Sequence, residues 1–207
     1  MLLPGGLLSL AAAQEKAYYG IALIGDPHLP GKNLPAKISA LRTIDGWPDI
    51  DRVVVLGDIC KESGTPGEYA AAKTFFNRLR KPARFVAGNH DYIYADKKNA
   101  LGKRVKALRD VRRVKLERFV ESFGLSGAYD SERLGGYLMI YLSTQENPQI
   151  FLWISGHMHV PAASESFSAA INLYGGRVMN IHNPDMERKT IWTNVLRLYP
   201  DRVVIRT

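Results

Sequence analysis

The stretch "ARFVAGNHD" at residues 83–91 runs from an apolar segment directly into a glycine, an amide, an imidazole and a carboxylate. A tight turn needs only the glycine and the asparagine, so His90 and Asp91 indicate chemistry beyond a turn. Two earlier apolar runs end in a similar way, "AYYGIALIGD" at Asp26 and "DRVVVLGD" at Asp58. Continuous apolar runs of this length are typical of buried parallel strands.

Helical patterns separate the three predicted strands. "NLPAKISALRTIDGW" carries apolar residues at helical spacing, and "TPGEYAAAKTFFNRLRK" begins with a capping box from Thr65 to Glu68 and a proline at the first helical position. Asp26, Asp58 and His90 follow one another at intervals of 32 residues, close to the ~30 residues of one βαβ unit. The sequence therefore predicts a layered α/β fold.

Composition restricts the class of protein without naming it. The 207 residues suffice for one domain with a sizeable core. The net charge of +8 favours anionic partners such as phosphate esters, nucleic acid or acidic surfaces. Cys60 is the only cysteine, which excludes an intrachain disulfide and a cysteine-built zinc site. We interpret it as a small buried apolar side chain.

The N-terminus, "MLLPGGLLSLAAAQEK", predicts a leader or partial signal peptide over residues 1–16, followed by one domain over residues 17–207. Its apolar run and three alanines resemble the core and cleavage site of a secretory signal, although no Lys or Arg precedes Lys16. The leader favours export to the periplasm, with a cytoplasmic location as the alternative. The run is too short to cross a bilayer, so no transmembrane segment is expected.

Residues 97–118 are strongly basic, with apolar residues threaded through them. The pattern predicts an amphipathic helix. A solvated helix face is favoured over a nucleic-acid or membrane contact, because no base-stacking aromatics interleave the charges. A nucleic-acid-binding module is therefore the last-ranked function. The apolar runs after residue 136 predict further strands, and the final two predict a hairpin split near Pro200.

A fourth polar cluster, Gly156-His157-Met158-His159, follows the apolar run "IFLWIS". Ligands of open α/β sheets bind at the carboxyl ends of the strands, so the four clusters are expected to converge there. Carboxylates, imidazoles and an amide without thiolate suit Mn, Fe, Zn, Ni or Co. A carboxylate can also bridge two such cations. The candidate side chains are Asp26, His28, Asp58, Asn89, His90, Asp91, His157 and His159.

Together these motifs resemble the signature of the calcineurin-like metallophosphoesterases, over about residues 17–160. The resemblance implies a four-layer α/β/β/α sandwich, with the strand-rich tail in its second sheet, and a centre of two divalent transition-metal ions such as Mn, Fe, Zn or Ni. It implies that His90 acts as general acid, oriented by Asp91, while the metals activate water for in-line attack. The implied metal ligands are Asp26, His28 and His159 for one ion, Asn89 and His157 for the other, and Asp58 as the bridge.

The implied function is metal-dependent hydrolysis of phosphomonoesters or phosphodiesters, with a small-molecule or nucleotide phosphate ester as substrate. One family element is missing, because no histidine lies between His90 and His157. The connection "STQENPQ" is also shorter than the dozen or more residues of a parallel crossover. We therefore expect the chain to lack one internal β-α segment near residues 144–145. The alternative function is a catalytically impaired metal- or phosphate-binding protein of the same fold. His182, the one unassigned histidine, is interpreted as structural rather than as a substitute ligand.

Overall fold

Three parallel strands, β1, β2 and β3, occupy one side of the main sheet, whose strand order is β10-β9-β1-β2-β3. β1 pairs with β2 and β2 with β3, both parallel, so the carboxyl ends of all three lie at one edge of the sheet. Helix α1 joins the first two strands and α2 joins the next two, as the sequence predicted. These elements are β1 (Tyr19–Ile24), α1 (Leu34–Gly46), β2 (Arg52–Leu56), α2 (Pro66–Phe76) and β3 (Ala83–Val86).

The predicted capping box begins α2. The Thr65 hydroxyl oxygen accepts the Glu68 backbone N–H at 3.3 Å, and the Glu68 carboxylate accepts the Thr65 backbone N–H at 3.0 Å. Two of the N–H groups that a helix start leaves without partners are thereby satisfied. The start of α2 is therefore determined by local sequence.

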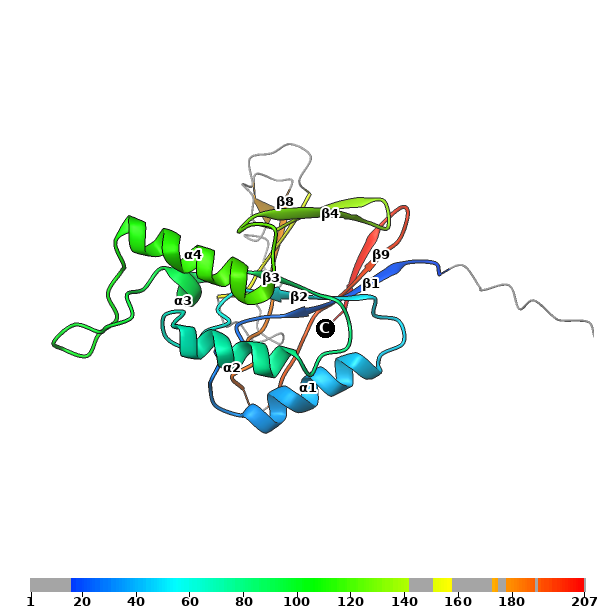
Figure 1. Cartoon of the computed structure of the whole chain (residues 1–207). Coiled ribbons are helices and arrows are strands. Elements are labelled where there is room, and N and C mark those ends of the chain that lie inside the picture. Colours follow the sequence, from blue (N-terminus) through cyan, green and yellow to red (C-terminus); the bar gives the residue numbers. More distant parts are fainter. Residues whose placement is uncertain (1–15, 142–150, 158–172, 175–177, 189, 207) are drawn as a thin grey trace, which may run out of the picture.

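The main sheet is buried on both faces. Ala22 and Ile24 of β1 pack into a core shared with the helices, whereas Ile21 and Leu23 point into a second core with Leu134. Helices α1 and α2 lie below the main sheet in Figure 1, with β4 and β8 above it. The described elements thus form a layer of helices, the main sheet and a layer of further strands, in that order. This arrangement confirms the α/β fold. The second core is covered by the antiparallel pair β4 (Asp130–Leu134) and β5 (Tyr137–Tyr141).

The C-terminal strands are divided between two sheets. The predicted hairpin forms, but β9 pairs antiparallel with β1 and so extends the main sheet. The expectation that the whole tail belongs to the second sheet is wrong, because Leu196 and Leu198 of β9 complete the same buried face as Ile21. The remaining strands pair in the order β6-β8-β7. Their bounds are β6 (Leu152–Ser155), β7 (Leu173–Tyr174), β8 (Val178–His182), β9 (Val195–Leu198) and β10 (Val203–Arg206).

The basic segment is not helical from residue 97. After the short helix α3 (Asn89–Tyr92), the chain forms a loop, and α4 covers only Arg109–Phe123. The Asn99 side-chain oxygen accepts the backbone N–H groups of Leu101 and Lys103, at 3.1 and 2.9 Å. Gly102 adopts a φ of 70° that a helix cannot contain. The helix prediction fails here because an asparagine-glycine turn outweighs the charge pattern.

The computed structural model describes residues 16–141, 151–157, 173–174, 178–188 and 190–206. Nearly all of the predicted leader, the junction at residues 144–145 and His159 lie outside these ranges. None of the helices within them is long and apolar enough to cross a membrane. Cys60 is fully buried, as interpreted from the sequence, and burial raises the pKa of its thiol.

Candidate metal centre

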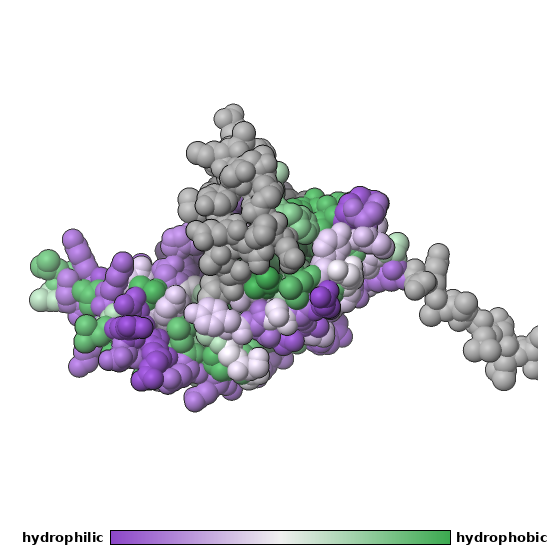
Figure 2. Space-filling view, turned by 90° about the horizontal axis from the view of Figure 1, so that it is seen from above, coloured by the Kyte–Doolittle hydropathy of each residue, from purple (hydrophilic) through white to green (hydrophobic). Residues whose placement is uncertain are grey.

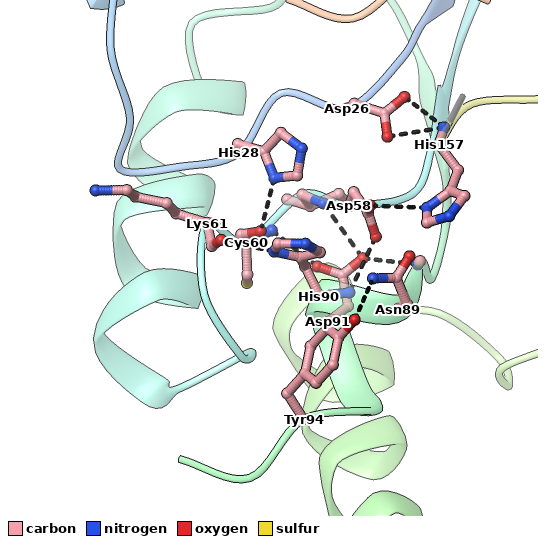
Figure 3. Close-up of polar contacts among 12 residues, drawn as sticks. Asp26, His28, Asp58, Cys60, Lys61, Asn89, His90, Asp91, Tyr94 and His157 are labelled. Carbon is pink, nitrogen blue, oxygen red and sulfur yellow. Dashed lines mark hydrogen bonds and ion pairs between the residues drawn. The ribbon is translucent and has the colours of Figure 1, made fainter. Parts of the chain in front are cut away.

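Three of the predicted ligands form one buried cluster where β1 and β2 end. Asp26, His28 and Asp58 each offer a ligand atom, and these atoms lie within 4.8 Å of one another. Their exposed fractions are 0, 6 and 2%. Figure 3 shows His28 and Asp58 facing each other below Asp26. Two carboxylates and an imidazole at this spacing are a donor set that a divalent transition metal fits.

The backbone at these positions is strained. Asp26, His28, Asp58 and His157 have φ values of 46°, 44°, 47° and 72°. Positive φ is uncommon for residues other than glycine and costs ~1–3 kcal/mol each. Within the described ranges, Asn33 is the only other non-glycine residue with a positive φ. Strain that coincides with predicted ligands indicates that the backbone is bent to aim these side chains, since strained residues cluster at functional sites.

Two glycines allow the acidic side chains to approach neighbouring strand ends. A Cβ on Gly88 would collide with Asp58 Oδ1, and a Cβ on Gly156 would lie 2.5 Å from Asp26 Oδ2. Any side chain at these positions would displace a carboxylate of the cluster. The glycines of the GNHD and GHxH motifs are therefore required by packing around the site.

The cluster has an excess of negative charge. The pKa of Asp26 is raised to about 8, chiefly by burial and also by the neighbouring carboxylates of Asp58, Asp185 and Asp91. The His157 backbone N–H, which donates to both Asp26 oxygens at 2.8 Å, opposes this rise. A buried carboxylate whose charged form is this disfavoured requires a proton or a cation beside it. The electrostatics agree with the donor set: both fit a metal cation.

Backbone carbonyls hold the first histidine and its loop in place. His28 Nδ1 lies 3.4 Å from the Cys60 carbonyl oxygen, an arrangement that directs Nε2 toward the ligand cluster. The fully buried Lys37 donates to the Pro27 carbonyl oxygen at 2.6 Å and to Glu187 at 3.0 Å. Lys37 thereby fixes the turn between Asp26 and His28.

The ligands predicted for the second metal are more open to solvent. His157 keeps 68% of its side chain exposed, and its Nδ1 lies 3.6 Å from Asp58 Oδ2. Asn89 is half-buried and donates through its amide nitrogen to the Tyr94 hydroxyl at 3.4 Å. Figure 3 shows both side chains on the far side of Asp58 from His28. Asp58 thus lies between His28 on one side and Asn89 and His157 on the other, which is the position expected of a bridging carboxylate.

His90 and Asp91 are adjacent in the sequence but have separate roles. The His90 ring lies beside His28, with centroids 4.7 Å apart, and its Nδ1 donates to the Lys61 carbonyl oxygen at 2.6 Å. The buried Asp91 carboxylate instead accepts backbone N–H groups of Ile59, Cys60 and Gly88 at 2.8–3.2 Å. The expectation that Asp91 orients the imidazole is corrected: Asp91 joins the ends of β2 and β3, and Lys61 supplies the orienting oxygen.

Burial raises the pKa of Asp91 to about 7, with the Asp58 carboxylate adding to the effect and the donated N–H groups opposing it. His182 lies on β8, where its Nδ1 is 3.1 Å from the Ser155 hydroxyl of β6. Burial lowers the pKa of His182. This contact between neighbouring strands supports the structural interpretation of His182.

Two groups near His90 were missed by sequence reasoning. Arg104 Nη1 lies 2.9 Å from Nδ1 and 2.8 Å from Nε2 of His90. The Lys61 carbonyl is a backbone group, so no residue type could have signalled it. Arg104 was assigned to a helix, although Asn99 and Gly102 are turn residues that could have placed it on a loop instead.

The match to a family model agrees with the geometry. A family model described as calcineurin-like phosphoesterase matches residues 19–137, more than half of the chain. The crystal structure of a phosphopantetheinyl hydrolase from Mycobacterium tuberculosis is similar at 13% sequence identity and a TM-score of 0.38. That match covers 84% of this chain and 58% of the hydrolase chain. No curated protein matches the sequence.

Proposed function

The chain belongs to the calcineurin-like phosphoesterase family, and from that premise we propose that it hydrolyses phosphomonoesters or phosphodiesters with bound divalent transition-metal ions. The observation that carries the proposal is the buried Asp26-His28-Asp58 cluster at strained strand ends. When bound, the cations would supply Lewis-acid chemistry, offsetting charge on the phosphoryl oxygens and activating water. Asp26, His28 and His159 would hold one ion, Asn89 and His157 the other, and Asp58 both.

His90 would protonate the leaving group. Its Nδ1–H is engaged by the Lys61 carbonyl oxygen, so the proton to be donated would be the one on Nε2, beside which Arg104 Nη1 lies at 2.8 Å. As a water oxygen bonds to phosphorus, the ester P–O bond breaks and a proton passes from His90 Nε2 to the departing oxygen. The proton that the attacking water gives up passes to solvent, from which His90 is reprotonated. The products are the alcohol and a phosphate, or a phosphomonoester when the substrate is a diester.

The test compares wild type with His90→Gln on two substrates in the presence of Mn²⁺. An alkyl phosphate such as glycerol 2-phosphate needs a proton on its leaving group, whereas 4-nitrophenolate departs without one. We expect turnover of the alkyl ester to fall by roughly 10²–10⁴-fold and that of the aryl ester by much less. Thermal unfolding of both proteins checks that the fold is retained. Equal rates for wild type and variant on both substrates would refute the enzyme assignment.

A catalytically impaired metal- or phosphate-binding protein is the second candidate. It is favoured by the absence of any histidine between His90 and His157 in the sequence. Metal analysis of the purified chain distinguishes the two. Two ions per chain support the hydrolase, and one or none with no turnover supports the binding protein.

A further inference from the structure

The basic loop (residues 97–106) is held beside the candidate metal centre. Its two arms are joined by backbone hydrogen bonds from Ala95 to Val105 and from Ala107 to Ile93, at 2.9 and 2.8 Å. The buried Lys115 of α4 ties the base of the loop through Asp96. Figure 2 shows this arm at the left of the molecule, with hydrophilic residues over much of its surface. The loop is therefore anchored at its base and can present its charges at fixed positions.

A cavity of about 780 Å³ lies between the basic loop and the site. His28 and His90 of the site line it, together with the cations Lys61, Lys103 and Arg104. This volume falls within the range of small-molecule pockets, ~300–1,000 Å³. The cavity can hold considerably more of a substrate than the phosphoryl group being transferred.

The cavity carries three cations in excess. Its two carboxylates are already engaged, Glu62 with Lys98 at 3.2 Å and Glu187 with the buried Lys37 at 3.0 Å. Partial burial would raise the pKa of Glu62, but Lys98, Arg104 and Lys61 hold it below its ordinary value. Across the described parts of the chain, no carboxylate forms an ion pair with Lys61, Lys103 or Arg104.

Arg104 is positioned by rings rather than by an acid. Its Nη1 is nearly equidistant from both nitrogens of His90, so it lies across the imidazole instead of in line with one lone pair. Its guanidinium carbon lies 5.0 Å from the centre of the Tyr94 ring. Such contacts leave a guanidinium free to form strong paired hydrogen bonds with a phosphate.

Arg104 contacts the residue that would protonate the leaving group, and Lys61 and Lys103 line the same cavity. These cations would therefore meet the leaving group rather than the phosphoryl group at the metals. We propose, resting on the proposed phosphoesterase function, that Lys61, Lys103 and Arg104 bind a second phosphoryl group carried by the leaving group. The substrate class is then a bisphosphate, or another phosphoester whose alcohol bears a further phosphate. The three residues determine specificity and take no part in bond breaking.

The test uses α,ω-alkanediol bisphosphates of three to six carbons, each paired with its monophosphate, and measures kcat/KM with Mn²⁺. Each charge-assisted contact is worth about tenfold or more. We expect the best bisphosphate to exceed its monophosphate by at least that factor in wild type. The ratio should approach two, the statistical value for a substrate with two identical esters, in the Lys103→Gln/Arg104→Gln double variant. It should stay unchanged in Lys106→Gln, which alters the same loop outside the cavity lining. A ratio of two or less in wild type, or an equal ratio in wild type and double variant, overturns the inference.

Turnover of 4-nitrophenyl phosphate in the same experiments tests the phosphoesterase function separately. If no ester is hydrolysed, calorimetric titration of the metal-loaded chain with the bisphosphates and monophosphates still decides the inference. Tighter binding of a bisphosphate that is lost in the double variant supports it. Equal affinity for both members of every pair refutes it.

Discussion

Asp26, His28 and Asp58 are at most 6% exposed at the ends of β1 and β2, whereas His157 leaves 68% of its side chain exposed on the other side of Asp58. The buried half comes from two neighbouring parallel strands whose pairing fixes the distance between their ends. The exposed half depends on α3 and on the second residue after β6, which belongs to a different sheet. This difference predicts that the two halves respond unequally to substitution, with the buried half more sensitive.

The largest effect is expected from Asp58→Asn. The substitution keeps the size of the side chain but removes the charge shared by both halves. Because substitution of residues that merely orient metal ligands already costs about 10–100-fold, we expect turnover and Mn²⁺ affinity to fall by ~100-fold or more. Phosphate release and metal content after dialysis measure this. A variant that retains both would show that Asp58 is not a ligand.

The next effect concerns the close approach of β3 to Asp58. Gly88→Ala places a Cβ against Asp58 Oδ1, so overpacking should lower the free energy of unfolding by ~1–3 kcal/mol and weaken metal binding. The matched control is Gly67→Ala, where an added Cβ contacts nothing within 4 Å. Urea unfolding compares the two. Equal stabilities would mean that the approach is not tight.

In metal-free protein, the raised pKa of the buried carboxylates should make the free energy of unfolding depend on pH. The pKa of Asp26 is raised to about 8 in the folded state, from about 3.9 when unfolded. The folded state therefore binds more protons up to that pH, and the free energy of unfolding falls as the pH rises. Between pH 7 and 8 the fall approaches ~1 kcal/mol. Asp91, raised to about 7, contributes mainly below this interval.

Urea unfolding in the presence of a chelator at pH 6, 7 and 8 measures this dependence. Asp26→Asn should be more stable than wild type at pH 8. In this variant the free energy of unfolding should fall much less between pH 7 and 8 than it does in wild type. Mn²⁺ should reverse the trend in wild type, because a bound cation replaces the proton. Stability that rises with pH in the metal-free protein would contradict the excess of negative charge inferred for the cluster.

The smallest effect is expected in the exposed half. His157→Gln removes a ligand whose place solvent can take, so we expect Mn²⁺ affinity to fall by about tenfold, the lower end of the 10–100-fold range. His182→Gln is the control, because His182 contacts Ser155 and no predicted ligand. Calorimetric titration with Mn²⁺ measures both variants. A loss in His182→Gln equal to that in His157→Gln would identify His182 as a substitute ligand.

The strand-end residues were predictable because parallel pairing is a local consequence of the pattern. Apolar runs at βαβ spacing place Asp26 and Asp58 at one sheet edge whatever the rest of the chain does. The role of Asp91 was not predictable, since its carboxylate could contact either the adjacent imidazole or the backbone N–H groups of Gly88 and of the distant Ile59 and Cys60. The choice was decided by the backbone N–H groups that follow β2 and β3, which donate to the Asp91 carboxylate.

The sequence by itself determined that strands β1, β2 and β3 follow one another with helices between them. It also determined the capped start of α2 and the polar side chains that end each strand. Tertiary structure alone decided that β9 joins the main sheet, that residues 97–106 form a loop rather than a helix, and that Arg104 lies against His90. The reason is the range of the interactions. Periodicity and capping act within a few residues, whereas contacts between segments far apart along the chain exist only after packing brings them together.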